Sequence, residues 1–342
     1  MGKATIGDVA KAAGVSVKTV SRVINNESGV KDATRQRVAE IVKQLDFRPN
    51  LNARSLRTRQ SYIIGVLFVD YSGNFYSHSI LTGAIEACDQ AGYNLLIRPL
   101  KINDIGFEPI IRQMHELSKP DGYLVCPPLC DDPNVIALLD ELGVPYVRIA
   151  PLNAQGSPFI RCQEEAASQK AVEHLINLGH QHIAMLSYLK GHGAGAWRLA
   201  GYKAALNKHN IPVVPEYIEE YGYDEEPNIL DSVIRRLLTK TQVRPTAIFC
   251  VNDTLAASVY RIASQMGLKI PYDLSIIGFD DDPMVENLWP PLTTIRQPIS
   301  TMGNYAAKML IKSLGNKPTA FETPALNCDL VLRNSTGPYL PS

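Results

Sequence analysis

The sequence predicts a small all-α head followed by an α/β body, built as two parallel-sheet lobes around a cleft. Residues 1–60 hold 12 Lys/Arg against 5 Asp/Glu, whereas the rest of the 342-residue chain holds 22 against 29. A basic head on an acidic body suggests a phosphate-seeking segment joined to a part with another task. Apolar residues recur at helical spacing in the head, whereas short apolar runs alternate with amphipathic stretches in the body. The length also exceeds that of one ordinary domain.

The first expected helix begins near Ile6, because "TIGD" at positions 5–8 has the form of a capping box. Gly14 then permits a sharp turn, since glycine can take a positive φ without a Cβ clash. Ser16 is a good N-cap for a second helix that ends near Ile24. A third helix is expected over residues 32–45.

Two short helices joined by a glycine-containing turn and braced by a third are typical of a helix-turn-helix, although a generic three-helix bundle fits too. In the former case the second helix would enter the DNA major groove. Arg22 could bond the O6 and N7 of guanine, Lys18 a base or a phosphate, and Val17 a thymine methyl group. The other expected contacts, suited to phosphate oxygens, are Thr5, Ser16, Thr19, Ser21 and Asn25.

The segment "FRPNLNARSLRTRQS" (47–61) has four arginines and little to bury. Residues 50–56 could form a short helix that is too short to be stable alone in water. Leu56 would then be an apolar residue on a basic segment, suited to wedging between base steps in the minor groove. A flexible linker fits the composition equally well.

The body begins at Tyr62. Strands are expected at residues 62–69, 94–99, 122–126, 145–150, 182–187, 247–251 and 274–280, and helices at 77–90, 165–178, 196–209, 228–238 and 254–266. This alternation indicates parallel sheets that are buried on both faces, in a run too long for one sheet. A ligand would bind at the carboxyl ends of the strands, in the cleft between two lobes.

Polar and aromatic residues follow the expected strands or begin the next helices: Asp70, Phe75, Tyr76, Trp197, Arg198, Asn252 and Asp280. Carboxylates accept hydrogen bonds from hydroxyls, and arginine donates in a fork, so the set suits a polyhydroxylated ring. Asp253, beside Asn252, could be the N-cap of the following helix. Trp197 could equally be a packing residue.

Two long stretches, "TIGDVAKAAGVSVKTVSRVINN" and "VKDATRQRVAEIVKQLDFRPNLNARSL", resemble the lac-repressor (LacI/GalR) family of bacterial transcription regulators. In the body, "EHLINLGHQHIAML", "GFDDDPMVENLWPPLTTIRQPISTMG" and "CDLVLRNSTG" are similar to the family's effector domain, which is periplasmic-binding-protein-like. The resemblance implies a helix-turn-helix domain in 1–46 and a hinge helix or linker in 47–61. It implies an N-terminal lobe of 62–161 and 292–325, and a C-terminal lobe of 162–291 and 326–342.

The resemblance also implies site residues. Paired hinge helices would place Asn50, Ala53 and Leu56 at the minor groove. Arg198 matches R-x-x-G-[FYW], Asp280 matches the first Asp of G-[YF]-D-D, and Asn252 matches an N-D pair, all implied to contact the effector. Tyr223 aligns with a stacking aromatic, and Phe75, Tyr76 and His192 with pocket positions. Many members have D-[ND] where this chain has "RCQEEAA", so no contact by Glu164 is implied. Residues 66–97 are similar to a subgroup linked with β-glucoside (salicin) use.

We therefore expect a cytoplasmic, homodimeric repressor that binds a pseudo-palindromic double-stranded operator and is controlled by a small sugar or glycoside. The alternative is a cytosolic sugar-binding protein without operator function. We expect no cofactor, metal or catalytic residue, because "GHGAG" (191–195) is not a P-loop and no G-x-S-x-G occurs. No apolar run approaches 18 residues, so no membrane span or secretion signal is expected. The six scattered cysteines are interpreted as reduced thiols.

Overall fold

The computed structural model describes residues 4–24, 28–47, 60–69, 75–100, 106–153, 155–188, 193–222, 227–239, 241–315 and 325–340. The chain divides into two compact units, Met1–Tyr62 and Ile63–Ser342, and each is described by itself. No helix among the described residues is both long enough and apolar enough to cross a membrane.

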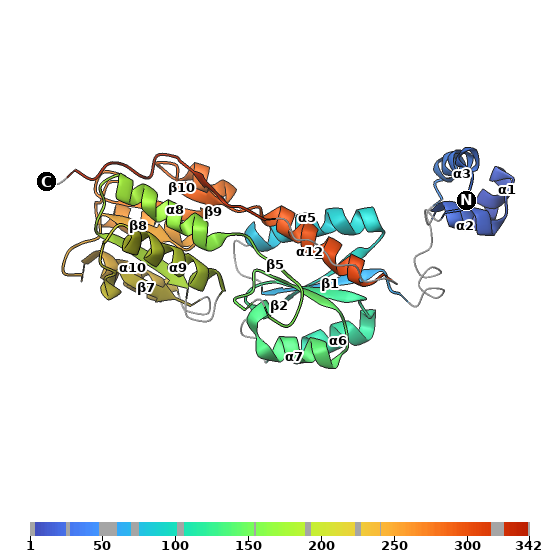
Figure 1. Cartoon of the computed structure of the whole chain (residues 1–342), viewed down its shortest axis with the longest axis horizontal. Coiled ribbons are helices and arrows are strands. Elements are labelled where there is room, and N and C mark those ends of the chain that lie inside the picture. The colour runs from blue at the N-terminus through green and yellow to red at the C-terminus, as the bar shows by residue number, and fades with distance from the viewer. Residues whose placement is uncertain are drawn as a thin grey trace. The chain divides into compact units, whose positions relative to one another are not determined.

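The head consists of α1 (Ile6–Ala13), α2 (Val17–Ile24) and α3 (Asp32–Gln44) (Figure 1). The Thr5 hydroxyl accepts the Asp8 N–H at 3.3 Å and the Thr5 N–H donates to the Asp8 carboxylate at 2.8 Å, which completes the expected capping box. Gly14 ends α1 with a φ of 63°. A small apolar core joins the three helices and contains Val9, Ala10, Ala13, Val20 and Val38.

The first sheet of the body has the strand order β2-β1-β3-β4-β5, and all pairs are parallel. Its strands are β1 (Ile63–Val69), β2 (Asn94–Leu100), β3 (Gly122–Val125), β4 (Tyr146–Ile149) and β5 (Phe159–Ile160). Helices α6 (Glu108–Ser118) and α7 (Pro133–Glu141) cover one face, and α5 (Phe75–Ala91) and α12 (Ile299–Ser313) cover the other (Figure 1). A 3-10 turn, η1 (Leu129–Asp131), precedes α7.

Helices α5 and α12 pack closely because glycines lie where they cross. A Cβ on Gly83 would lie 1.7 Å from the Ser300 carbonyl oxygen, and one on Gly303 would lie 2.1 Å from the Ile80 carbonyl oxygen. Helix α12 is thereby held on the first lobe, although the strand that directly precedes it, β10, belongs to the second.

The second sheet has the order β11-β10-β9-β8-β6-β7; among the described residues the β10–β11 pair is antiparallel and the other pairs are parallel. Its strands are β6 (Ile183–Tyr188), β7 (Ile218–Tyr221), β8 (Ala247–Cys250), β9 (Ser275–Asp280), β10 (Thr293–Arg296) and β11 (Asp329–Val331). The helices of this lobe are α8 (Glu164–Asn177), α9 (Gly193–Lys208), α10 (Pro227–Thr239) and α11 (Asp253–Gln265), with 3-10 turns η2 (Pro215–Tyr217) and η3 (Pro283–Asn287).

The chain passes between the lobes three times, from β5 to α8, from β10 to α12 and from α12 to β11. Because β10 pairs with β9, residues 293–296 belong to the second lobe, and their assignment to the first lobe from the sequence was wrong. The physical reason is that Thr293 and Thr294 are buried in the second lobe, where the Thr294 hydroxyl donates to Asp253 at 2.6 Å. The polypeptide changes lobe only after Arg296.

Candidate functional site

The exposed side of α2 is the candidate nucleic-acid interface of the head. Val17 is 47% exposed, Lys18 is exposed, and Arg22 is half-buried on the same helix. The Ser16 hydroxyl accepts the Thr19 N–H at 3.1 Å and lies 2.9 Å from the Thr19 hydroxyl, so it caps α2 as expected. An exposed apolar group and two cations on one short helix can contact both base edges and phosphates.

Thr5 is exposed, and its hydroxyl donates to the Asp8 carboxylate at 2.7 Å. These hydrogen bonds hold the pKa of the Asp8 carboxyl below its usual value. Ser21 lies half-buried on α2. Seven expected site residues lie outside the described residues: Asn25, Asn50, Ala53, Leu56, Asp70, His192 and Tyr223.

In the body, Arg198 is the centre of a buried charged cluster and is only 3% exposed. Its Nε donates to a Glu164 carboxylate oxygen at 2.7 Å, and its Nη2 lies 3.7 Å from the Asp280 Oδ1. Its Nη1 donates to the Val251 carbonyl oxygen, and its guanidinium stacks 3.6 Å from the centroid of the Phe279 ring. The fold therefore brings together Arg198 and Asp280, which the sequence predicted as partners in one site.

Asp280 ends β9 with a φ of 110°, in a conformation that side-chain-bearing residues seldom adopt. Burial raises the pKa of its carboxyl from 3.8 to about 7, against the opposing effects of Arg198 and of the Gln297 amide. The Gln297 amide donates to Asp280 Oδ1 at 2.6 Å. The Asp280 carboxyl therefore changes its charge near neutral pH.

Glu164, for which the resemblance implied no effector contact, belongs to the buried cluster. It is 3% exposed in the first turn of α8 and forms the shortest ion pair of the cluster with Arg198. In the structure, Cys162 and Glu164 are buried while residues 161, 163 and 165 are exposed. The amino-acid pattern alone does not distinguish Glu164 from Glu165, so only the fold shows which of the two pairs with the buried arginine.

The cluster adjoins the places where the chain crosses between lobes. The Cys162 thiol, after β5, donates to the Gln297 Oε1 at 3.3 Å, and Gln297 follows β10. The Gln163 N–H donates to the Leu326 carbonyl oxygen at 2.9 Å, which joins the first crossover to the third. Gln297 therefore connects the Asp280 carboxyl to a second crossover segment.

Two aromatic residues carry buried polar atoms with no hydrogen-bond partner among the described residues, the Tyr76 hydroxyl and the Trp197 indole N–H. Burial, followed by the Glu164 charge, raises the pKa of the Tyr76 hydroxyl well above its usual value. Phe75 and Tyr76 begin α5 of the first lobe, so this helix brings an unsatisfied hydroxyl towards the charged cluster. Such atoms are rare in folded proteins and are expected where a ligand completes the bonding.

Asn252 has the helix-cap role that one interpretation of the sequence gave to Asp253. Asn252, not Asp253, is the N-cap of α11, because its Oδ1 accepts the Leu255 N–H at 2.8 Å. Asp253 is buried and accepts from the Thr294 hydroxyl and, at 2.8 Å, from the Asp282 N–H. The helix-cap interpretation of Asp253 was wrong, because its carboxylate ties α11 to strand β10 instead.

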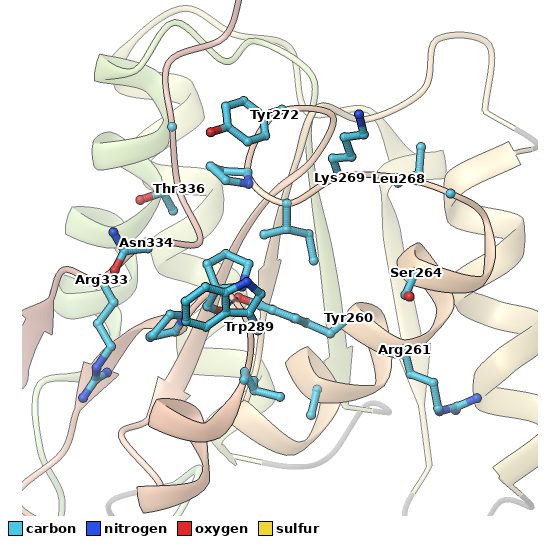
Figure 2. Close-up of a pocket in the computed structure, with 18 of the residues that line it drawn as sticks. Tyr260, Arg261, Ser264, Leu268, Lys269, Tyr272, Trp289, Arg333, Asn334 and Thr336 are labelled. Carbon is cyan, nitrogen blue, oxygen red and sulfur yellow. Dashed lines mark hydrogen bonds between the residues drawn. The ribbon is translucent and has the colours of Figure 1, made fainter.

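A hollow of about 1270 Å³ lies in the second lobe, at the end of α11 opposite to Asn252. Figure 2 shows Tyr260, Trp289 and Tyr272 around it. The Trp289 and Tyr272 side chains are 89% and 85% exposed. We call the surface formed by Tyr260, Tyr272 and Trp289 the aromatic face. Large exposed aromatic side chains that gather in this way are typical of interaction surfaces.

Among the described residues, no group of three or more His, Cys, Asp or Glu side chains could hold a metal ion.

The model of bacterial regulatory proteins of the lacI family matches residues 5–50, and that of a periplasmic binding protein-like domain matches residues 172–336. These two matches fall on the head and on the body as the fold divides them.

Relatives match along nearly the whole chain. The ribose operon repressor of Haemophilus influenzae is 34% identical over 340 residues, which cover 97% of this chain and 98% of that protein. The probable HTH-type transcriptional repressor ExuR of Bacillus subtilis is 32% identical over 335 residues, with coverage of 97% and 98%. The lac repressor dimer bound to operator and the anti-inducer ONPF superposes with a TM-score of 0.76 at 28% identity, over 98% of this chain and 100% of that one.

The expected fold is confirmed, both in the helix-turn-helix head and in the parallel-sheet lobes. Head, body and relatives agree, and this protein belongs to the lacI family of bacterial regulatory proteins, as a DNA-binding regulator.

Proposed function

We propose that this regulator is a repressor whose operator affinity is controlled by a small sugar or glycoside bound between the lobes. The observation that carries the proposal is the buried cluster of Arg198, Glu164 and Asp280, joined through Gln297 to the crossovers. Such a cluster can bond ring hydroxyls as both donor and acceptor. Its attachment to the crossovers gives a bound ligand a route to the arrangement of the lobes.

On the DNA side, α2 would lie in the major groove, with Arg22, Lys18 and Val17 at the bases and Ser16, Thr19 and Ser21 at phosphates. Thr5 and Asn25 would add phosphate contacts. Asn50, Ala53 and Leu56 would act in the minor groove between two half-sites. The exposed Val17 supports this orientation, because an apolar side chain on an exposed face of a basic helix has no core to join.

On the effector side, the Tyr76 hydroxyl and the Trp197 N–H would gain partners from ligand oxygens, which would remove the cost of leaving buried polar atoms unpaired. Asn252 would contact the effector in addition to capping α11. Phe75 and Tyr223 would pack on the ring, and Asp70 and His192 would bond its hydroxyls. The β-glucoside resemblance stays a prediction.

A pseudo-palindromic operator needs two heads, so we propose a homodimer that forms through the aromatic face. Trp289 and Tyr272 offer large aromatic area with little ordering cost, as buried anchors at the centre of an interface do. A second copy is the occupant that a two-fold operator requires.

The proposal is tested by operator selection from random duplexes, followed by gel shifts at several salt concentrations and with a panel of sugars. Specific affinity should fall steeply as salt rises, because phosphate contacts release counterions. Arg22→Ala should abolish specific binding, whereas Arg37→Ala on the exposed side of α3 is the matched control. If no specific duplex is selected while sugars still bind, the chain is a sugar-binding protein and the repressor proposal is wrong.

The sugar arm of this experiment tests the effector site separately. Asp280→Ala should leave operator binding intact and remove the response to the sugar. A variant that the sugar still releases normally would refute the role of the cluster.

A further inference from the structure

The geometry points to an acidic effector: we propose that the inter-lobe site takes a sugar bearing a carboxylate or phosphate group, and that Arg161 binds this group. The inference rests on the proposed function, because it names the class of molecule that the same site binds.

Arg161 directly follows β5, so it lies at the carboxyl end of a parallel strand and just before α8. Its guanidinium carbon is 4.5 Å from the centroid of the Trp197 ring on α9 and 6.0 Å from that of Phe159. A guanidinium stacked on an aromatic face is held in orientation while the N–H groups along its edge stay available. Arg161 is therefore prepared for bidentate binding of a planar oxyanion.

The Arg161 side chain is exposed and has no carboxylate partner among the described residues. Arg198 is committed to Glu164 and Asp280, whereas Arg161 forms no ion pair with any carboxylate of the described residues. A neutral sugar would leave the second arginine unpaired at the site. An acidic substituent on the sugar would supply the missing anion.

A cavity of about 300 Å³ lies beside Arg161, and Trp197, Cys162 and Glu164 also line it. Since Glu164 is the partner of Arg198, this cavity adjoins the charged cluster. The Trp197 indole N–H is buried without an acceptor, and both guanidinium and indole can only donate. Donors without acceptors favour an oxygen-rich acid group, and the small volume favours a monosaccharide.

Two carboxylates line the cavity, and one of them, Glu164, is paired with Arg198, whereas the other acts against an acidic ligand. The carboxylate of Glu165 lies on the same cavity and would repel an acidic ligand. Glu165→Gln should therefore strengthen binding of the acid, while Arg161→Gln weakens it. The two changes have opposite expected signs at one cavity, which a general loss of folding cannot imitate.

The test uses the full chain, with thermal shift and calorimetry against matched sets of D-glucose, D-glucuronate and D-glucose 6-phosphate, and the corresponding galactose set. In at least one set, an acid should bind about tenfold or more tightly than its neutral sugar. The carboxylate and phosphate arms decide which acid group the site prefers. Arg161→Gln should remove the preference for the acid over the neutral sugar, and Arg161→Lys should retain part of it.

Arg112→Gln is the control, because Arg112 on α6 is paired with Glu108 and Glu141 away from the cavity. Equal binding of acid and neutral sugars, or a preference that survives Arg161→Gln, would overturn the inference and leave a neutral-sugar repressor standing. Absence of binding by every sugar would reject the effector proposal as well, while operator binding, measured separately, would still stand.

Discussion

Replacing Asp280 by asparagine should stabilise the body above pH 7 and at the same time remove its response to effector. Burial raises the pKa of this carboxyl from 3.8 to about 7, so the folded state holds the proton more tightly than the unfolded chain does. The contribution to stability is complete below about pH 4 and is lost as the pH rises towards 7. Asparagine is neutral at every pH and escapes that loss.

The magnitude follows from the two pKa values. The difference between 3.8 and about 7 corresponds to about 4 kcal/mol of unfolding free energy above pH 7, at about 1.4 kcal/mol for each pH unit. At pH 5 the same linkage leaves a difference of about 2 kcal/mol. Asp280→Asn should thus raise the free energy of unfolding by about 4 kcal/mol at pH 8 and by about 2 kcal/mol at pH 5. Arg198 keeps its Glu164 partner in the variant, so no buried charge is left alone.

The assay is urea unfolding of the full chain at pH 5 to 8, with tryptophan fluorescence as the signal. Both tryptophans, Trp197 and Trp289, lie in the body, so the signal reports on the unit that contains Asp280. Asp89→Asn is the control, because Asp89 is exposed on α5. Equal or lower stability of Asp280→Asn at pH 8, or a gain that does not change with pH, would refute the reasoning.

Three further outcomes are expected. Gln297→Leu should keep the fold but weaken the effect of sugar on operator affinity, measured by gel shift with and without sugar, because the bond to Asp280 is lost. Trp289→Ser should shift the dimer towards monomer in analytical ultracentrifugation without lowering the urea midpoint, since Trp289 is almost fully exposed. Gly83→Ala should cost about 3 kcal/mol in urea unfolding, because its methyl group would clash with the Ser300 carbonyl; an unchanged midpoint would contradict this packing.

The parts of the structure that the sequence predicted well are those decided by neighbouring residues. The capping box at Thr5 and the left-handed turn at Gly14 depend on a few adjacent positions, so the head could be derived from them. Arg198 and Asp280 could be placed at strand and helix ends for the same local reason. Their meeting in one cluster follows from the general rule that the carboxyl ends of parallel strands share an edge.

The parts that could not be predicted depend on which segments meet across the lobes. Strand β10 is buried in the second sheet, although the helix after it packs on the first lobe, and periodicity does not encode that exchange. Gln297 follows an ordinary short strand, and nothing near it in sequence indicates Asp280 as its partner. The pairing of Glu164 with Arg198 joins residues 34 positions apart, and the segment that holds Glu164 departs from the family pattern that would have indicated it.

The charged cluster lowers the stability of the unliganded body, and a bound ligand would restore that stability. Without ligand, two carboxyls share one arginine in a dry environment, and two aromatic residues hold unpaired polar atoms beside them. Each of these features destabilises the unliganded fold, and a ligand with suitable oxygens and hydroxyls would relieve them together. Gln297 and Cys162 connect the cluster to two of the crossovers. Ligand binding at the cluster would therefore change the contacts of the segments that pass between the lobes. A neutral residue at position 280 would remove part of the cost and the reason for the ligand to act, so stability and response should change in opposite directions.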